Sequence, residues 1–179
     1  MELLRRIRFW NNVDRMGPDI PTTHVKLFFK GSARRLCVRK FKYFGEGAEF
    51  RPGAYAIACS KISIGKNVVI RPTTMLFAEP IYDGGEIIIE DNVLIGSGVH
   101  IYTTNHNYSN PHELIINQGY TVKEVILKAG CWIGANSIIV PGATIGENSV
   151  VAAGSVVTKS IPDKVVVAGA PARIIKYIK

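Results

Sequence analysis

The chain has only three cysteines among its 179 residues, Cys37, Cys59 and Cys131. An odd number of cysteines excludes a fully paired disulfide framework, and their wide spacing matches no metal-binding pattern. The sequence also lacks a run of about eighteen apolar residues, so we expect no transmembrane helix. Its N-terminus lacks the short apolar core and the small-residue cleavage site of a secretory signal peptide. Together these absences predict a reduced, cytoplasmic protein.

Acidic residues are scarce in the first quarter of the chain. Residues 1–43 hold 11 Lys and Arg against three acidic residues, whereas residues 44–179 hold 11 of each, so the difference of +8 is the whole net charge. Four apolar residues at the start of this basic segment have helical spacing: Leu3, Leu4, Ile7 and Trp10. An amphipathic helix of this kind either packs on the protein body or lies on an anionic membrane surface. Because no nucleic-acid-binding motif accompanies the charge, we expect no nucleic-acid partner.

The dominant pattern of the sequence is an aliphatic residue at every sixth position. The series is unbroken through Leu127, Ile133, Ile139, Ile145, Val151 and Val157. A small residue follows each of the first five by four positions: Cys131, Ser137, Ala143, Ser149 and Ser155. The same interval occurs earlier, in Ile89, Ile95 and Ile101, in Ile64, Ile70 and Leu76, and in Phe44 and Phe50. Helices repeat every 3.6 residues and strands every two, so a period of six predicts short strands joined by tight turns, with three hexads in each coil. Coils stacked about 4.8 Å apart form a parallel β-helix.

Interruptions of the repeat predict loops at the corners of the coils. Ile89 follows Leu76 by thirteen residues, and Leu127 follows Ile101 by twenty-six. The second interruption predicts an excursion loop at about 105–124, and a loop of this length in a compact domain is usually functional or disordered. His106 occupies the outward position of the last hexad before that loop. A side chain held by a rigid strand beside a long loop is well placed for catalysis.

Four motifs near the C-terminus carry a family resemblance. They read Cys-Trp-Ile-Gly-Ala from Cys131, Ile-Val-Pro-Gly-Ala-Thr-Ile-Gly-Glu-Asn from Ile139, Ala-Gly-Ser-Val-Val-Thr-Lys from Ala153, and Ala-Gly-Ala-Pro-Ala-Arg from Ala168. Through them the chain resembles the hexapeptide-repeat acyltransferases, in particular the galactoside, maltose, nodulation and O-antigen sugar O-acetyltransferases. The resemblance implies an all-β fold, a left-handed parallel β-helix over residues 44–168. A basic, partly helical segment at 1–43 precedes it and a C-terminal helix at 169–179 follows it. The resemblance also implies a homotrimer with active sites between subunits.

The resemblance implies an activity as well, the transfer of an acetyl group from acetyl-CoA to a sugar hydroxyl. In the family, the histidine before the long loop is the general base, and the stretch Ile101–His106 matches that location. A sugar hydroxyl is a poor nucleophile until its proton is removed, and an imidazole, with an ordinary pKa near 6.5, is a suitable base at cellular pH. The developing oxyanion needs a donor, which a backbone N–H can supply. Direct transfer requires neither an acyl-enzyme intermediate nor a metal.

The same resemblance assigns the binding residues. Those expected at the coenzyme A groove are Trp132, Ala135, Ala153, Thr158, Lys159, Arg173 and Lys176. Those expected at the acceptor are Glu79, Tyr82, Asp83 and Asn105. The loop after His106 is longer than in the galactoside enzymes, and the segment at 1–43 does not match their helical cap. Both departures favour a sugar of surface polysaccharide or lipopolysaccharide synthesis as the acceptor, with the enzyme at the inner membrane surface.

Three alternatives stay open at this point. One is an N-acetyltransferase of an amino or nucleotide sugar, and another is a non-catalytic β-helix scaffold, because a fold does not fix a function. The third is a zinc site like that of the γ-class carbonic anhydrases, which needs three converging imidazoles. His100 and His106 are expected on different faces of the β-helix, and no third histidine lies in an early coil, so we predict no metal site.

Overall fold

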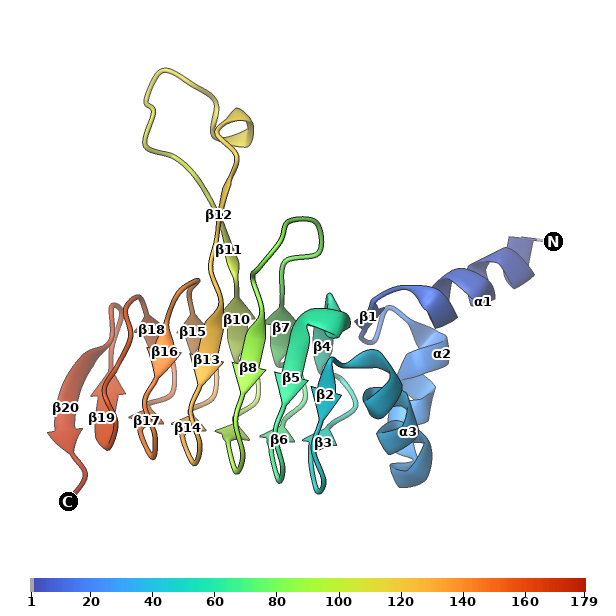
Figure 1. Cartoon of the computed structure of the whole chain (residues 1–179), viewed down its shortest axis with the longest axis horizontal. Coiled ribbons are helices and arrows are strands. Elements are labelled where there is room, and N and C mark those ends of the chain that lie inside the picture. Colours follow the sequence, from blue (N-terminus) through green and yellow to red (C-terminus); the bar gives the residue numbers. More distant parts are fainter. Residues whose placement is uncertain (1) are drawn as a thin grey trace.

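The computed structural model describes residues 2–179 as a three-sided prism of stacked coils, with helices at its N-terminal end (Figure 1). Each side of the prism is a parallel sheet, and two of the three sheets end in one antiparallel strand. Face 1 contains β1 (Arg15–Met16), β4 (Tyr55–Ile57), β7 (Met75–Phe77), β10 (His100–Tyr102), β15 (Ile138–Ile139) and β18 (Val156–Val157). Face 2 contains β2 (Tyr43–Phe44), β5 (Ile62–Ile64), β8 (Ile87–Ile89), β13 (Val125–Leu127) and β16 (Thr144–Ile145). Face 3 contains β3 (Glu49–Phe50), β6 (Val69–Ile70), β9 (Leu94–Ile95), β14 (Trp132–Ile133), β17 (Val150–Val151), β19 (Val165–Ala168) and β20 (Arg173–Tyr177). The chain passes through faces 2, 3 and 1 in turn in every coil.

The six-residue repeat fills the interior of the prism. Ile133, Ile139 and Ile145 lie on three consecutive strands, which belong to faces 3, 1 and 2 of the prism. All three residues are 0% exposed. The five small residues that follow the repeat positions are buried as well. Full burial of one such aliphatic side chain is worth about 1.5–3 kcal/mol, so the repeat supplies most of the apolar stabilisation of each coil. The predicted three-sided parallel β-helix is confirmed.

The corners between faces 2 and 3 are short and similar from coil to coil. Asn67 and Asn92 occupy equivalent corner positions with φ of 54° and 61°, in a left-handed region that asparagine tolerates better than most residues. The side-chain amide of Asn67 donates a hydrogen bond to Oδ1 of Asn92 at 3.1 Å. Stacked corners of this kind hold adjacent coils in register.

The N-terminal segment forms a helical cap over the first coil. It contains α1 (Glu2–Asn12), α2 (Pro21–His24), the 3-10 helix η1 (Val25–Phe28) and α3 (Lys30–Lys40). Phe41, at the end of α3, packs its ring 5.8 Å from that of Phe44 and 5.3 Å from that of Phe50, measured between centroids. By contrast, α1 buries none of its residues and extends away from the body (Figure 1). Within residues 2–179, no helix is both long enough and apolar enough to cross a membrane.

The expectation of a C-terminal helix at 169–179 is wrong, because this segment contains the strand β20 (Arg173–Tyr177). β20 pairs antiparallel with β19, the outermost strand of the last coil. A turn at Gly169, with φ of 99°, reverses the chain before it. The β-branched residues Ile174 and Ile175 favour an extended chain, and pairing covers the edge that β19 would otherwise expose.

Candidate active site

Both large interruptions of the repeat leave the prism at the same edge, where face 1 passes into face 2. The short loop, residues 78–86, joins β7 to β8, and the long loop, residues 103–124, joins β10 to β13. They rise on the same side of the prism (Figure 1). We call this edge the excursion edge. In the long loop, β11 (Thr104–His106) and β12 (Tyr120–Val122) pair as an antiparallel ribbon. The short helix η3 (Ile115–Asn117) lies beyond this ribbon.

His106 lies at the end of β11, exposed to solvent. The ribbon register places it opposite Tyr120, and the two ring centroids are 4.5 Å apart at an interplanar angle of 46°. The coil interior ends two residues after Ile101, at the buried Thr103, so the chain has already left the prism when it reaches His106. A hydrogen-bonded strand therefore presents the imidazole at the foot of a long loop.

Two tyrosines connect His106 to the short loop. The ring centroid of Tyr82 lies 6.0 Å from that of Tyr120, which in turn flanks His106. Both tyrosines are almost half exposed, so they form an aromatic wall beside the imidazole that is open to solvent. Neither the six-residue repeat nor the family motifs point to Tyr120. Its position depends on the register of the β11–β12 ribbon, which no motif reveals.

The four expected acceptor residues gather at this edge but differ in exposure. Tyr82, Asp83 and Asn105 are exposed, whereas Glu79 is only 4% exposed. Oε1 of Glu79 accepts hydrogen bonds from the backbone N–H groups of Ile81, at 2.7 Å, and Tyr82, at 3.2 Å. Its Oε2 accepts one from the Thr104 hydroxyl at 2.5 Å. Burial alone would raise the pKa of Glu79, but these hydrogen bonds and the nearby charge of Lys61 outweigh it and hold the pKa below its ordinary value.

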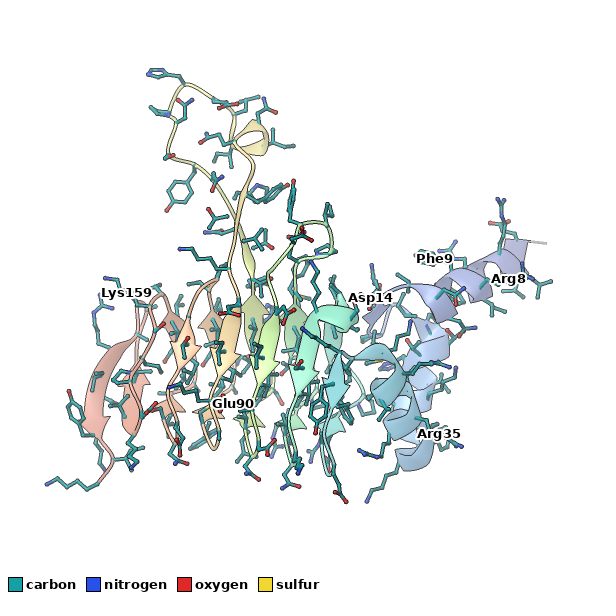
Figure 2. All side chains as sticks on the ribbon, in the orientation of Figure 1. Arg8, Phe9, Asp14, Arg35, Glu90 and Lys159 are labelled. Atoms are coloured by element: carbon teal, nitrogen blue, oxygen red, sulfur yellow. The ribbon has the colours of Figure 1, made fainter. Side chains whose placement is uncertain are left out.

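The expected donor residues occupy two separate regions of one chain. Thr158 and Lys159 follow β18 at the excursion edge, and Lys159 lies on the side from which the loops rise (Figure 2). The other five lie on face 3, opposite that edge, or at the corner between faces 3 and 1: Trp132, Ala135, Ala153, Arg173 and Lys176. The distance across the prism separates these residues from His106, so a single chain does not assemble the whole predicted site.

Face 3 presents a row of apolar side chains around Trp132. Trp132 is 52% exposed and stands in register with Leu94 on one neighbouring strand and with Val150 on the other. Lys176 pairs with Val166 at the end of the same face. The corner carrying Ala135 and Ala153 is closely stacked, because the backbone N–H of Gly154 donates to the carbonyl of Ala135 at 2.8 Å.

The two histidines are separated, but not as two faces of the prism: the expected place of His106 at the outward position of a regular hexad is wrong, because β11 belongs to the loop ribbon. His100 lies on face 1, and its Nδ1 is 2.9 Å from the hydroxyl oxygen of Tyr102. His106 lies beyond the corner on the loop ribbon. Among residues 2–179, no group of three or more His, Cys, Asp and Glu side chains is placed to hold a metal ion.

Comparison with known proteins identifies the repeat and several relatives. Residues 124–159 match the family described as bacterial transferase hexapeptide (six repeats), and residues 86–101 match the hexapeptide repeat of succinyl-transferase. The chain is 40% identical over 143 residues to galactoside O-acetyltransferase of Escherichia coli K12, an alignment that covers 80% of this chain and 67% of that protein. It superimposes on a galactoside acetyltransferase solved in complex with coenzyme A with a TM-score of 0.76 at 32% identity, covering 98% of this chain and 78% of the other. A hexapeptide-repeat acetyltransferase from Vibrio cholerae, complexed with acetyl coenzyme A, gives a TM-score of 0.76 at 27% identity, with 90% of each chain covered.

These matches correct one expectation and establish the family. Because the superposition on the galactoside enzyme covers 98% of this chain, it includes helices of the N-terminal cap, and the expected departure of this segment from the galactoside enzymes is wrong at the level of the fold. At 40% identity over two thirds of a known relative, the chain belongs to the hexapeptide-repeat acyltransferases, in their sugar O-acetyltransferase branch.

Proposed function

We propose that this protein transfers an acetyl group from acetyl-CoA to a sugar hydroxyl, with His106 as the general base. The position of His106 carries the proposal. Its imidazole is exposed on a paired strand, at the foot of the long loop and beside the aromatic wall of Tyr120 and Tyr82. A base held by a rigid strand, with open space in front of it, is suited to an acceptor that enters from solvent.

The proposed reaction is a direct transfer. The imidazole takes the proton of the acceptor hydroxyl as the hydroxyl oxygen bonds to the thioester carbon, and a backbone N–H group of a neighbouring coil stabilises the oxyanion. The C–S bond then breaks, and the imidazolium returns the proton to the departing thiolate. The cysteines favour this route over an acyl-enzyme formed on cysteine, because burial raises the pKa of the Cys37 and Cys131 thiols to about 12. Burial raises the pKa of Cys59 as well, so none of the three offers a reactive thiolate.

The separation of the donor residues supports a shared site between subunits. We propose a left-handed coil and a C3 homotrimer, in which the excursion edge of one subunit faces the Trp132 surface of its neighbour. Acetyl-CoA would then lie between the two, with its thioester near His106 of one subunit. Its pantetheine would lie along Ala135 and Ala153, and its phosphates near Arg173 and Lys176 of the other subunit. Light scattering should give three times the mass of the chain, and a monomer at micromolar concentration would contradict the arrangement.

The acceptor we propose is a sugar of surface polysaccharide or lipopolysaccharide synthesis; of the two departures expected from the galactoside enzymes, the longer loop after His106 is the one that still supports it. Tyr82, Asp83 and Asn105 are exposed around the imidazole and would contact it. An assay of thiol release from acetyl-CoA, with matched hydroxy- and amino-sugar acceptors, tests the chemistry. Release with hydroxy sugars is expected. Release with amino sugars alone would favour the N-acetyltransferase, and a protein that fails to bind acetyl-CoA in calorimetry would be a scaffold.

We also propose that the cap associates with the cytoplasmic surface of the inner membrane through α1. Leu3 and Leu4, on the predicted apolar side of this helix, are both more than half exposed, and Arg5, Arg6 and Arg8 are exposed on the same helix. A helix with one apolar side and basic residues on the rest of its surface is typical of segments that lie on anionic lipid. Flotation with vesicles tests this. The protein should float with vesicles that contain the anionic lipid phosphatidylglycerol, and not with vesicles of phosphatidylcholine alone. Equal behaviour with both lipids, or no flotation, would contradict it.

A further inference from the structure

The short loop closes on the side chain of Glu79. The carboxylate lies under the loop, where Oε1 accepts hydrogen bonds from the backbone N–H groups of Ile81 and Tyr82. The backbone N–H of Glu79 itself donates to the carbonyl of Gly85 at 3.3 Å. From outside the loop, the Lys61 ammonium donates to the carbonyls of Tyr82 and Gly84. These contacts fix the loop from its first to its last residues.

The other oxygen of Glu79 reaches out of the short loop to the long one. Its Oε2 accepts a hydrogen bond from the hydroxyl group of Thr104, the first residue of β11, at 2.5 Å. Backbone packing supports the same junction, because Gly85 has φ of 63° and a Cβ built there would lie 2.6 Å from Cβ of Glu79 and 2.7 Å from Cγ1 of Val122. The base of the short loop is therefore packed against both strands of the β11–β12 ribbon.

The ribbon carries His106, and the contacts of Glu79 reach it by two routes. Thr104 lies two residues before His106 on the same strand. The backbone N–H of Tyr82 donates a hydrogen bond to the carboxylate, and the Tyr82 ring contacts Tyr120. The Tyr120 ring in turn flanks the imidazole. No hydrogen bond within residues 2–179 orients the His106 ring itself. The direction of the ring depends on the strand and on Tyr120. Glu79 contacts the strand directly through Thr104, and it reaches Tyr120 indirectly, through Tyr82.

We infer that Glu79 is a positioning residue: its carboxylate ties the short loop to the strand of His106 and so sets the general base. This inference rests on the proposed role of His106. It replaces the expectation that Glu79 contacts the acceptor, because the side chain is buried and both of its oxygens already accept protein hydrogen bonds. A buried carboxylate with three donors is well suited to fix two loops relative to each other.

The test compares Glu79→Ala and Thr104→Val with two controls. Both variants remove the link and should lower kcat about tenfold to a hundredfold, the usual cost of a misplaced catalytic group. The acetyl-CoA KM should stay within about twofold, because the link touches no donor contact. Glu79→Gln should keep at least about a third of kcat, since its carbonyl can accept the backbone N–H groups and its amide can donate to the Thr104 oxygen. The control for charge is Glu86→Ala, which removes a carboxylate of the same loop that pairs with Lys42 at 2.6 Å, and kcat should not change.

Repeating the Glu79→Ala change in a His106→Ala background separates this inference from the proposed function. If Glu79 acts through His106, it should have almost no further effect there. A full additional loss in that background, or wild-type kcat in both Glu79→Ala and Thr104→Val, would overturn the positioning role while leaving His106 as the base. If His106→Ala alone keeps wild-type kcat, the proposed function fails and the inference fails with it. Thermal melting and light scattering on each variant exclude misfolding, and Thr104→Val keeps the side-chain shape if Glu79→Ala is unstable.

Discussion

Two edges of the same prism show how one repeat serves both structure and chemistry. At the edge between faces 2 and 3, every coil turns through a short corner such as the one at Asn67 or Asn92, and the corners stack on each other. At the excursion edge, the short and long loops interrupt the same six-residue pattern (Figure 1). The inward residues beside the two edges are equally well buried: Ile95 is 1% exposed, and Ile101 and Leu127 are 0% exposed. The difference shows that the regular coils supply a fixed frame, and that the insertions add exposed polar groups to it without weakening the interior.

Removing the imidazole at the excursion edge should have the largest effect. We expect His106→Ala to lower kcat by about 10²–10⁴, the usual contribution of a positioned base. Melting temperature and donor binding should not change, because the side chain lies outside the interior and away from face 3. The matched control is His112→Ala, which removes an exposed histidine of the same loop and should retain activity. Steady-state assays with saturating acetyl-CoA measure both variants.

A cavity in the interior of the regular coils should lower the stability of the protein and leave kcat unchanged, the opposite of the His106 variant. Ile133 is fully buried in β14, so Ile133→Ala should lower the free energy of unfolding by about 2–5 kcal/mol. The kcat per folded molecule should stay near wild type at low temperature. Denaturant unfolding followed by circular dichroism gives the first quantity. A stable variant that has lost its activity would show that the frame and the site are not separable as we describe.

A change at the donor region should alter KM more than kcat. Arg173 is exposed on β20 and is proposed to bind the phosphates of acetyl-CoA, far from the thioester. Contacts of this kind stabilise the ground and transition states alike, so Arg173→Ala should raise the acetyl-CoA KM about tenfold with little change in kcat. Initial rates at varied acetyl-CoA measure the two constants. An unchanged KM would mean that the nucleotide lies elsewhere.

A stacked corner should show a smaller effect on stability alone. Asn92→Ala removes a residue suited to φ of 61° and its hydrogen bond to Asn67. Because alanine is strained in the left-handed region, the free energy of unfolding should fall by about 1 kcal/mol. Activity should not change. Denaturant titration beside wild type checks this, and a loss of kcat would contradict the division between the two edges.

Acidification should reveal the weakest of these effects, at Glu79. The pKa of this carboxyl is held below its ordinary value, so its ionised form stabilises the folded state at neutral pH. That contribution is lost as the pH falls through the native pKa and the carboxylate is protonated. The stability difference between wild type and Glu79→Gln should therefore be present at pH 7 and shrink toward acidic pH. A difference that grows on acidification would mean that the pKa is raised instead.

Most of the fold could be predicted from the sequence, because each coil repeats the same interior pattern. Residues such as Leu127 and Ile133 show it without reference to distant parts of the chain. The C-terminal strand could not be predicted in the same way, since β20 has no buried residue and is held by pairing with β19. Propensity at Ile174 and Ile175 was the only local signal, and the expected helix was wrong.

The candidate site was predictable only in part. The position of His106 followed from the place where the repeat breaks and from the family resemblance. Tyr120 lies beside the imidazole because of a ribbon register that no spacing reveals. The burial of Glu79 depends on two loops that meet at one edge. From sequence alone, a carboxylate in a polar segment is predicted to be exposed. Contacts between insertions were therefore the part that sequence reasoning missed.

The pH dependence of kcat in wild type and in His106→Ala tests the central claim most directly. If His106 is the base at the excursion edge, the wild-type rate should rise with pH as an imidazole loses its proton and then reach a plateau. The residual rate of the variant should not show that rise with pH. A variant that keeps the same pH dependence, or more than about a third of wild-type kcat, would contradict the account, because the proton would then be taken by another group.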